Sequence, residues 1–304
     1  MKKIINVSNL VKAYGKLKAV DGISFHVQKG EIFGLLGENG AGKTTTLEML
    51  EGLRKPSSGE ITVLNCNLGN DTDRIKEQIG VQLQSSAYYS FLTLKEILEL
   101  FGSFYQKRLD PIGLLEMVDL KEKANSYVGS LSGGQKQRFS IVASLVNDPE
   151  VVFLDEPTTG LDPLARRNLW DLISKIKSQG KTIILTTHYM EEAEVLCDRI
   201  AIIERGKILA MDDTHRLMNM AEYPYTVNFV KENVPETTIN KLDKLGKVEN
   251  LFGKNNHFIV RVKEKKDSDE AIKIVESIKP ETITSGRATL EDLFIELTGK
   301  TIED

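Results

Sequence analysis

Nine consecutive residues near the N-terminus constrain the fold of this chain more than any other stretch. The run Gly37-Glu38-Asn39-Gly40-Ala41-Gly42-Lys43-Thr44-Thr45 fits the pattern G-x-x-x-x-G-K-[ST] of a phosphate-binding loop. The apolar run 31–36 before it is typical of a short buried strand, and residues 45–50 are typical of the start of a helix. Glycines let the backbone curl so that successive N–H groups point at phosphate oxygens, and a helix N-terminus adds partial positive charge. The sequence therefore predicts a strand–loop–helix unit that binds a nucleoside triphosphate.

Two side chains of this loop have the clearest predicted roles. Lys43 should reach the β- and γ-phosphates, and the hydroxyl of Thr44 should hold Mg²⁺. The other nucleotide-binding candidates in the loop are Gly37, Asn39, Gly40, Ala41, Gly42 and Thr45. The loop alone predicts triphosphate binding and leaves open what the energy of the nucleotide drives.

The composition excludes some classes of protein. The chain has 304 residues, enough for about two domains, and 40% of them are hydrophobic, enough for a core. Its 40 Lys and Arg residues against 44 Asp and Glu residues give a net charge of −4, so no overall basic field favours nucleic acid as a partner. Cys66 and Cys197 lie far apart and outside any metal-ligand spacing, which favours reduced cytosolic thiols.

Neither a signal peptide nor a membrane span is expected. The N-terminal residues include two lysines but no unbroken apolar stretch. No apolar run approaches the ~18 residues that a membrane span needs. If the protein works at a membrane, another chain has to supply the spans.

The order of patterns along the chain predicts an α/β fold. Residues 1–30 alternate apolar and polar side chains, as antiparallel strands do, with Tyr14 at the turn between them. From about 73 to 145 helical spacing prevails, so a helical subdomain of about 85–145 is expected inside the nucleotide domain. A strand, a helix, a second strand and a closing hairpin are expected after it: 151–154, 163–178, 182–185 and 198–208.

The composition changes after about Arg216, where a smaller α+β domain is expected to begin. The predicted boundaries are 1–216 for the nucleotide domain and 217–304 for this accessory domain, in which no catalytic constellation is found. Two strands, a hairpin loop and two helices are expected there: 225–229, 258–262, 253–256, 269–278 and 290–298, the last helix with a capping box of Thr289 and Asp292.

A second motif places two carboxylates at the end of an apolar strand. The run 151–154 is followed by Asp155 and Glu156, and ligands bind at the carboxyl ends of strands in open α/β sheets. Asp155 would hold Mg²⁺, directly or through water, and Glu156 would polarise the attacking water as a general base. Acids at a helix start are the ordinary alternative, and the phosphate loop upstream favours the catalytic interpretation.

A third motif, Leu131-Ser132-Gly133-Gly134-Gln135, precedes the acidic strand. Ser132 can cap a helix whose first turn has free N–H groups, and the two glycines permit the close approach of an anion. By itself this motif is an ordinary capped helix. What distinguishes it is its position inside the helical insertion, shortly before the two acids.

In this order, the three motifs resemble those of the ATP-binding cassette (ABC) ATPases, over about residues 1–216. The resemblance implies a P-loop NTPase fold with a RecA-like core, an antiparallel β subdomain and a helical insertion, and it implies ATP and Mg²⁺ as ligands. Tyr14 resembles the aromatic residue that stacks on adenine, although a surface tyrosine at a strand edge is the alternative. Asp162 resembles the aspartate of the D-loop that crosses to a partner cassette, and His188 resembles the switch histidine that contacts the γ-phosphate.

One position departs from the usual family pattern. The glutamine that links Mg²⁺ to the transport partner should follow Ile79-Gly80, where this chain has Val81-Gln82-Leu83-Gln84, with Leu83 where proline is common. The register of the family motif, counted from Ile79-Gly80, favours Gln84 as the catalytic and Mg²⁺-binding glutamine. Gln82 is the alternative.

The resemblance also implies partners. Members of this family bind ATP between two cassettes arranged head to tail, and the motif 131–135 of one faces the γ-phosphate held by the other. This chain has one phosphate loop and one such motif, which implies a homodimer or a paired cassette. The runs 188–194 and 289–299 resemble exporters of the drug, antibiotic and polysaccharide type, which use a separate membrane permease. The second run is also compatible with an amphipathic helix that packs on its own domain.

The implied function is that of an ATP-binding and ATP-hydrolysing subunit of an ABC exporter, held at the cytoplasmic face of the cell membrane by its permease. A soluble ABC ATPase that acts on ribosomes or DNA is the alternative, but such proteins usually join two cassettes or carry coiled coils or zinc fingers. A regulatory binding module with little turnover is opposed by the presence of both Glu156 and His188. The sequence leaves the cargo open.

Overall fold

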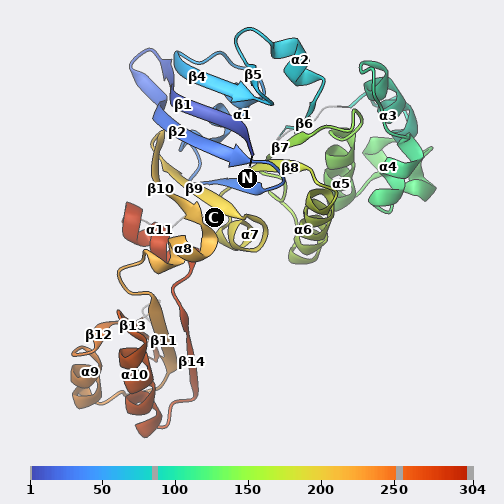
Figure 1. Cartoon of the computed structure of the whole chain (residues 1–304). Helices are drawn as coiled ribbons and strands as arrows, with labels where there is room; N and C mark the ends of the chain where they lie inside the picture. The colour runs from blue at the N-terminus through green and yellow to red at the C-terminus, as the bar shows by residue number, and fades with distance from the viewer. Residues whose placement is uncertain (1, 84–87, 251–255, 300–304) are drawn as a thin grey trace. The chain divides into compact units, whose positions relative to one another are not determined.

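The computed structural model describes residues 2–83, 88–250 and 256–299. The chain divides into two compact units, Met1–Asp213 and Thr214–Asp304 (Figure 1). The first unit contains the phosphate loop and the two other motifs.

A mostly parallel sheet forms the centre of the first unit. Its strands are β3 Ile32–Leu36, β6 Ile79–Gln82, β7 Val151–Asp155, β8 Thr182–Thr187, β9 Arg199–Glu204 and β10 Lys207–Asp213. They lie in the order β10-β9-β3-β8-β7-β6, and β9 and β10 form the predicted antiparallel hairpin at one edge. The strands β3, β7 and β8 are buried along their whole length. Their short, unalternating apolar runs are what a parallel sheet covered on both faces requires.

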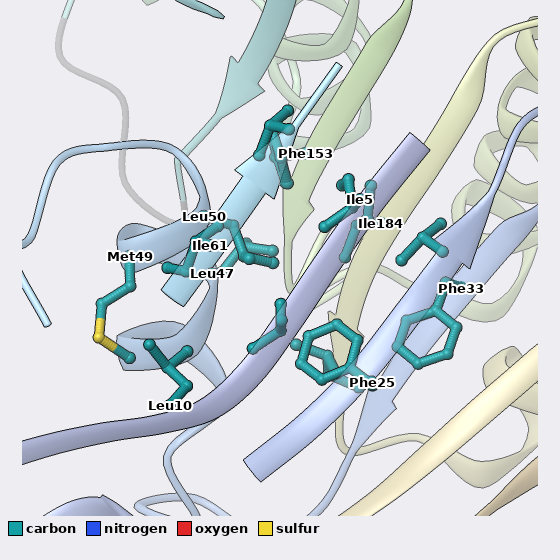
Figure 2. Close-up of a cluster of buried hydrophobic side chains, with 14 of the residues drawn as sticks. Ile5, Leu10, Phe25, Phe33, Leu47, Met49, Leu50, Ile61, Phe153 and Ile184 are labelled. Carbon is teal, nitrogen blue, oxygen red and sulfur yellow. The ribbon is translucent and has the colours of Figure 1, made fainter. Parts of the chain in front are cut away.

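A second, antiparallel sheet packs with this one around a shared core. Its strands, in the order β2-β1-β4-β5, are β1 Lys3–Tyr14, β2 Leu17–Gln28, β4 Ser58–Val63 and β5 Cys66–Asn67. Phe25 of β2 stacks on Phe33 of β3 with ring centroids 5.3 Å apart. Leu47 and Met49 of helix α1 (Lys43–Leu50) belong to the same buried cluster (Figure 2). This core holds β3 and α1 in place, and therefore also holds the loop that joins them.

Besides α1, the helices of the first unit are α2 Thr72–Lys76, α3 Leu94–Ser103, α4 Pro111–Met117, α5 Gly133–Ala143, α6 Pro163–Ser178 and α7 Met190–Leu196. The predicted helical insertion is among them, but it begins later than residue 73, where the helical spacing begins in the sequence. The expectation of helical structure from about residue 73 is wrong at β6, which pairs in parallel with β7. A strand of four residues that contains Gly80 is too short to show a period of its own.

The second unit has its own sheet and its own core. Its elements are α8 Thr214–Asn219, β11 Tyr225–Val230, α9 Glu236–Leu242, β12 Gly246–Asn250, β13 His257–Val262, α10 Lys265–Ser277, β14 Thr282–Arg287 and α11 Leu290–Thr298. The strands are antiparallel in the order β12-β13-β11-β14. Val227 and Phe229 of β11 and Val260 of β13 are buried together with Ala271 and Val275 of α10.

The structure confirms most of the elements predicted for this unit. The two strands and the last helix form where the alternation placed them, and the capping box of Thr289 and Asp292 is present. Helix α10 begins at Lys265, before the predicted start at 269, because its polar first turn carries no apolar signal. Most of the predicted hairpin loop 253–256 lies outside the described residues. In the part of the chain that the structure describes, no helix is both long enough and apolar enough to cross a membrane.

Candidate nucleotide-binding site

The phosphate loop connects β3 to α1, and two of its glycines are fixed by close packing. A Cβ atom on Gly37 would lie 2.2 Å from the carbonyl oxygen of Ile203. A Cβ on Gly42 would lie 2.3 Å from the carbonyl oxygen of Ala19, and Gly42 has a φ of 104°, which favours glycine. The loop can therefore curl tightly only with glycine at both positions. Asn39 and Gly40, at its tip, are exposed.

The amino group of Lys43 lies inside this curl. The side chain is 3% exposed, and Nζ donates to the carbonyl oxygens of Gly37 at 2.8 Å and Glu38 at 3.1 Å. Nζ also lies 3.4 Å from Oε1 of Glu156. Burial lowers the pKa of Lys43, and the carboxylates of Glu156 and Asp155 oppose this fall. The loop thus holds a cation at the position where the sequence predicted contact with the β- and γ-phosphates.

Asp155 ends β7 and meets the first turn of α1. Its Oδ1 accepts hydrogen bonds from the hydroxyl of Thr186 at 2.5 Å and from that of Thr44 at 3.2 Å. Burial raises the pKa of Asp155, and the two hydroxyl groups oppose the rise. Thr44 and Asp155, the two described residues predicted to hold Mg²⁺, are therefore in direct contact. A hydroxyl and a carboxylate oxygen are hard ligands of the kind that Mg²⁺ prefers.

Glu156 joins the phosphate loop to the end of β8. Its φ of 46° lies in the left-handed region, a conformation that is strained for a glutamate and is common at functional sites. Its Oε2 lies 3.4 Å from Nδ1 of His188 and accepts a hydrogen bond from the hydroxyl of Thr159 at 3.2 Å. His188 and, less strongly, Lys43 lower the pKa of Glu156 to about 2 although burial opposes them. The carboxylate is therefore ionised at neutral pH, which is the protonation state that the predicted role of general base requires.

The structure also shows a residue that the sequence reasoning missed. Thr186 of β8 donates its hydroxyl proton to Asp155, and the same oxygen accepts the backbone N–H of Glu156 at 2.9 Å. One side chain thus orients both acids. The only sequence signal was the polar end of an otherwise apolar strand, in the run 186–188.

The motif 131–135 lies at the start of α5, apart from the phosphate loop. Ser132 caps this helix as predicted, by accepting the backbone N–H of Gln135, while the side chain of Gln135 accepts the backbone N–H of Ser132. Ser132 and Gly133 are exposed, whereas Leu131 is buried. The motif thus forms an exposed, capped helix start, which is the local structure that the sequence predicted for it.

Of the remaining predicted residues, the structure describes Tyr14 and Asp162 but not Gln84. Tyr14 ends β1, is 43% exposed, and its hydroxyl oxygen accepts a hydrogen bond from Arg54. Asp162 caps α6 by accepting the backbone N–H of Ala165 at 2.9 Å. Gln84 lies outside the described residues. Its alternative, Gln82, is buried at the end of β6 and donates to the carbonyl oxygen of Leu83 at 2.7 Å.

Comparison with known proteins identifies the family. The sequence profile of ABC transporters matches residues 20–159. The Nod factor export ATP-binding protein I of Burkholderia lata is 37% identical over 305 residues, which cover 99% of this chain and 98% of that protein. The chain belongs to the ATP-binding proteins of ABC transporters. A second member, the linearmycin resistance ATP-binding protein LnrL of Bacillus subtilis, is 35% identical and covers 99% of this chain and 100% of that protein.

Solved structures of ABC proteins confirm the fold class predicted from the sequence. An ATP-binding subunit of an ABC transporter has a TM-score of 0.64 and 31% identity, and the match covers 70% of this chain and 91% of that one. A dimeric ATP-binding cassette in a post-hydrolysis state, bound to ADP and Pi, has a TM-score of 0.63 and 26% identity over 69% of this chain and 98% of that one. As an ABC family member, this chain is an ATPase subunit that binds and hydrolyses ATP.

Proposed function

We propose that two copies of this ABC subunit close head to tail around two ATP molecules and that this closure drives a separate membrane permease. Each copy would supply the phosphate loop and acids of one site and the capped helix of the other. The dimeric cassette among the structural relatives supports this arrangement.

The observation that carries the proposal is the division of the site into two halves. Lys43, Asp155, Glu156 and His188 are joined by contacts around the phosphate loop. The exposed N-terminus of α5 is a second anion site in a different subdomain. An exposed, capped helix start is well suited to complete the site of a second chain.

Each residue of the composite site then has a role. Lys43 and the loop N–H groups hold the β- and γ-phosphates, and Tyr14 stacks on the adenine. Mg²⁺, held by Thr44, Asp155 and Gln84, would neutralise charge on the phosphates. Glu156 accepts a proton from the attacking water, and His188 contacts the γ-phosphate. Asp162, at the start of α6, would lie at the contact with the second copy. The residues proposed to face the γ-phosphate held by the second copy are those of the third motif: Leu131, Ser132, Gly133, Gly134 and Gln135.

Replacing Ser132 with Arg should block hydrolysis and spare ATP binding. A long cation at the α5 N-terminus would fill the space needed by the γ-phosphate of the partner copy, while each chain keeps its own phosphate loop. We expect turnover to fall about 100-fold or more, with the Kd for ATP of the isolated chain unchanged. Steady-state hydrolysis and equilibrium binding of a fluorescent ATP analogue measure both. Equal hydrolysis by the variant and the parent would contradict a shared site.

The permease would dock in an apolar groove beside β6. The groove has a volume of about 490 Å³ and is lined by Leu53, Leu83, Phe104 and Tyr105, among others, with Glu51 at the end of α1. Phe104 is 68% exposed, and exposed apolar side chains around a groove are typical of protein interfaces. Burial raises the pKa of Glu51 to about 8, so the groove carries little negative charge from this residue at neutral pH. The names of the relatives, which are export and resistance ATP-binding proteins, support an exporter at the cytoplasmic face of the membrane.

Affinity capture from detergent-solubilised membranes tests this partner. The tagged chain should recover an integral-membrane protein with several apolar spans, and Phe104→Asp should lose it, because a buried charge opposes docking in an apolar groove. Leu17→Asp is the matched control, since Leu17 is also 68% exposed but lies at the start of β2, away from the groove lining. Equal recovery by both variants would exclude this groove as the docking site.

A further inference from the structure

A buried polar pair links the two helices that follow the catalytic segments. The indole Nε1 of Trp170 in α6 donates to Oε1 of Glu192 in α7 at 3.1 Å. Glu192 is 0% exposed and Trp170 is 7% exposed. Helix α6 begins directly after Asp162, and α7 begins two residues after His188. The pair therefore connects the segment predicted to face a second copy with the segment that carries the switch histidine.

The carboxyl group of Glu192 also lies beside the ends of the catalytic segments. Burial raises its pKa, and the hydroxyl groups of Thr187 and Thr158, together with the indole of Trp170, oppose the rise. Thr187 directly precedes His188, and Thr158 follows Glu156 by two positions. The one hydrogen bond recorded for this carboxyl group among the described residues comes from Trp170 of α6, and its Oε2 and the hydroxyl of Thr158 have no hydrogen-bond partner there. The buried group thus links α7, to which it belongs, directly to α6.

A second contact between the same segments lies next to this pair. The guanidinium carbon of Arg166 in α6 lies 4.1 Å from the ring centroid of Tyr189, a cation–π geometry. The rings of Tyr189 and His188 are themselves 4.1 Å apart, and the backbone N–H of Tyr189 donates to the hydroxyl of Thr187 at 3.0 Å. Helix α6 therefore contacts the residue after His188 through two half-buried side chains and Glu192 in the interior. Two such contacts fix a short segment more firmly than one.

We propose that Glu192 and Trp170 are positioning residues. They would hold His188 beside Glu156, where its Nδ1 lies 3.4 Å from Oε2, and would couple His188 to α6. A displacement of the Asp162 end of α6 by a second copy would move the indole, then the Glu192 carboxyl, and with it the start of α7. The proposal rests on the proposed function, because it requires His188 to act at the γ-phosphate. Both side chains are buried, so in this proposal they act through His188.

Substitutions at the pair should lower kcat and leave KM nearly unchanged. Glu192→Ala and Trp170→Phe each remove one partner of the hydrogen bond, and we expect kcat to fall about tenfold, because small misplacements of a catalytic group are costly. Glu192→Gln keeps an acceptor oxygen and should recover most of the loss. The double variant should be no slower than the worse single variant, because both changes break one link. Loss of the same size in Glu192→Gln, or fully additive losses, would overturn the proposal.

A structural control separates positioning from simple destabilisation. Ile176 is buried in the same helix, beyond the pair. Ile176→Ala should lower the melting temperature at least as much as Trp170→Phe but leave kcat within about twofold, because a cavity in the core affects stability first. If Ile176→Ala and Trp170→Phe both lose kcat in proportion to the fall in their melting temperatures, the pair has only a structural role.

The chain offers a direct probe, because Trp170 is its single tryptophan. In a Glu156→Gln background, Mg²⁺ and ATP should change the emission of Trp170, since closure around ATP would move the indole relative to Glu192. The same addition should leave the emission of the Glu192→Ala, Glu156→Gln double variant unchanged. An unchanged emission in the Glu156→Gln background, at ATP concentrations that saturate binding, would overturn the coupling.

His188→Ala distinguishes failure of this inference from failure of the proposed function. If His188→Ala retains full hydrolysis, the switch histidine is wrongly assigned and the proposed function fails at this residue. If His188→Ala loses hydrolysis while Glu192→Ala and Trp170→Phe keep it, only the positioning proposal fails.

Discussion

Replacing Glu156 with Gln is expected to abolish ATP turnover and leave ATP binding intact. The carboxylate lies between Lys43 and His188, which lower its pKa to about 2, so it is ionised at neutral pH; in the proposed function it accepts a proton from the attacking water. An amide of the same shape cannot accept that proton. Loss of a general base lowers rates by about 10²–10⁴-fold, whereas the phosphate loop and Lys43 still bind the nucleotide. Single-turnover hydrolysis and equilibrium binding of ATP measure the two effects separately.

The same variant should accumulate as a dimer. If closure requires ATP and reopening requires hydrolysis, a chain that binds ATP without hydrolysing it stays closed. Size-exclusion chromatography with light scattering should show a monomer without nucleotide and a dimer with ATP. Glu150→Gln is the matched control, because Glu150 is a half-exposed acid just before β7 that pairs with Lys29 at the surface. A Glu156→Gln chain that remains monomeric at saturating ATP would refute the head-to-tail proposal.

The features that the sequence predicted correctly are those set by local chemistry. The strand–loop–helix unit around Lys43, the cap of Ser132 on α5 and the helix Pro163–Ser178 each depend on residues that are close in sequence. The antiparallel strands at the N-terminus and the hairpin 198–208 follow from alternation and turn residues in the same way. Their short range is why a pattern of residues was enough to find them.

The features that the sequence did not predict depend on contacts between distant segments. Thr186 orients Glu156 from 30 positions away, and Trp170 and Glu192 meet across 22 positions. Strand β6 is recognisable only through its pairing with β7. Local propensity carries no information about such pairings, because tertiary packing decides them. The assignment of Gln84 over Gln82 stays a prediction.

Replacing Lys43 with Ala is expected to weaken ATP binding and abolish turnover. The amino group lies inside the loop, where it would donate charge-assisted hydrogen bonds to the β- and γ-phosphates. Losing a hydrogen bond to a charged group costs about 1.5–3 kcal/mol, which corresponds to roughly a 10- to 100-fold increase in Kd. Isothermal titration with ATP measures the change. Lys207→Ala, at an exposed lysine of β10, is the control and should leave Kd unaltered. Undiminished hydrolysis by Lys43→Ala would refute the phosphate-loop assignment.

Mixing the Lys43→Ala and Ser132→Arg chains provides the strongest test of shared sites. Each variant alone forms only dimers in which both sites are defective. A mixed dimer combines the intact phosphate loop of the Ser132→Arg chain with the intact α5 N-terminus of the Lys43→Ala chain, so one of its two sites is whole and the other carries both defects. At equal concentrations about half of the dimers are mixed, and if the sites act independently, turnover should recover to about a quarter of the parent value. Recovery should follow the product of the two chain concentrations as their ratio is varied. A site contained within one chain would give no recovery at any ratio, because neither variant could supply what the other lacks.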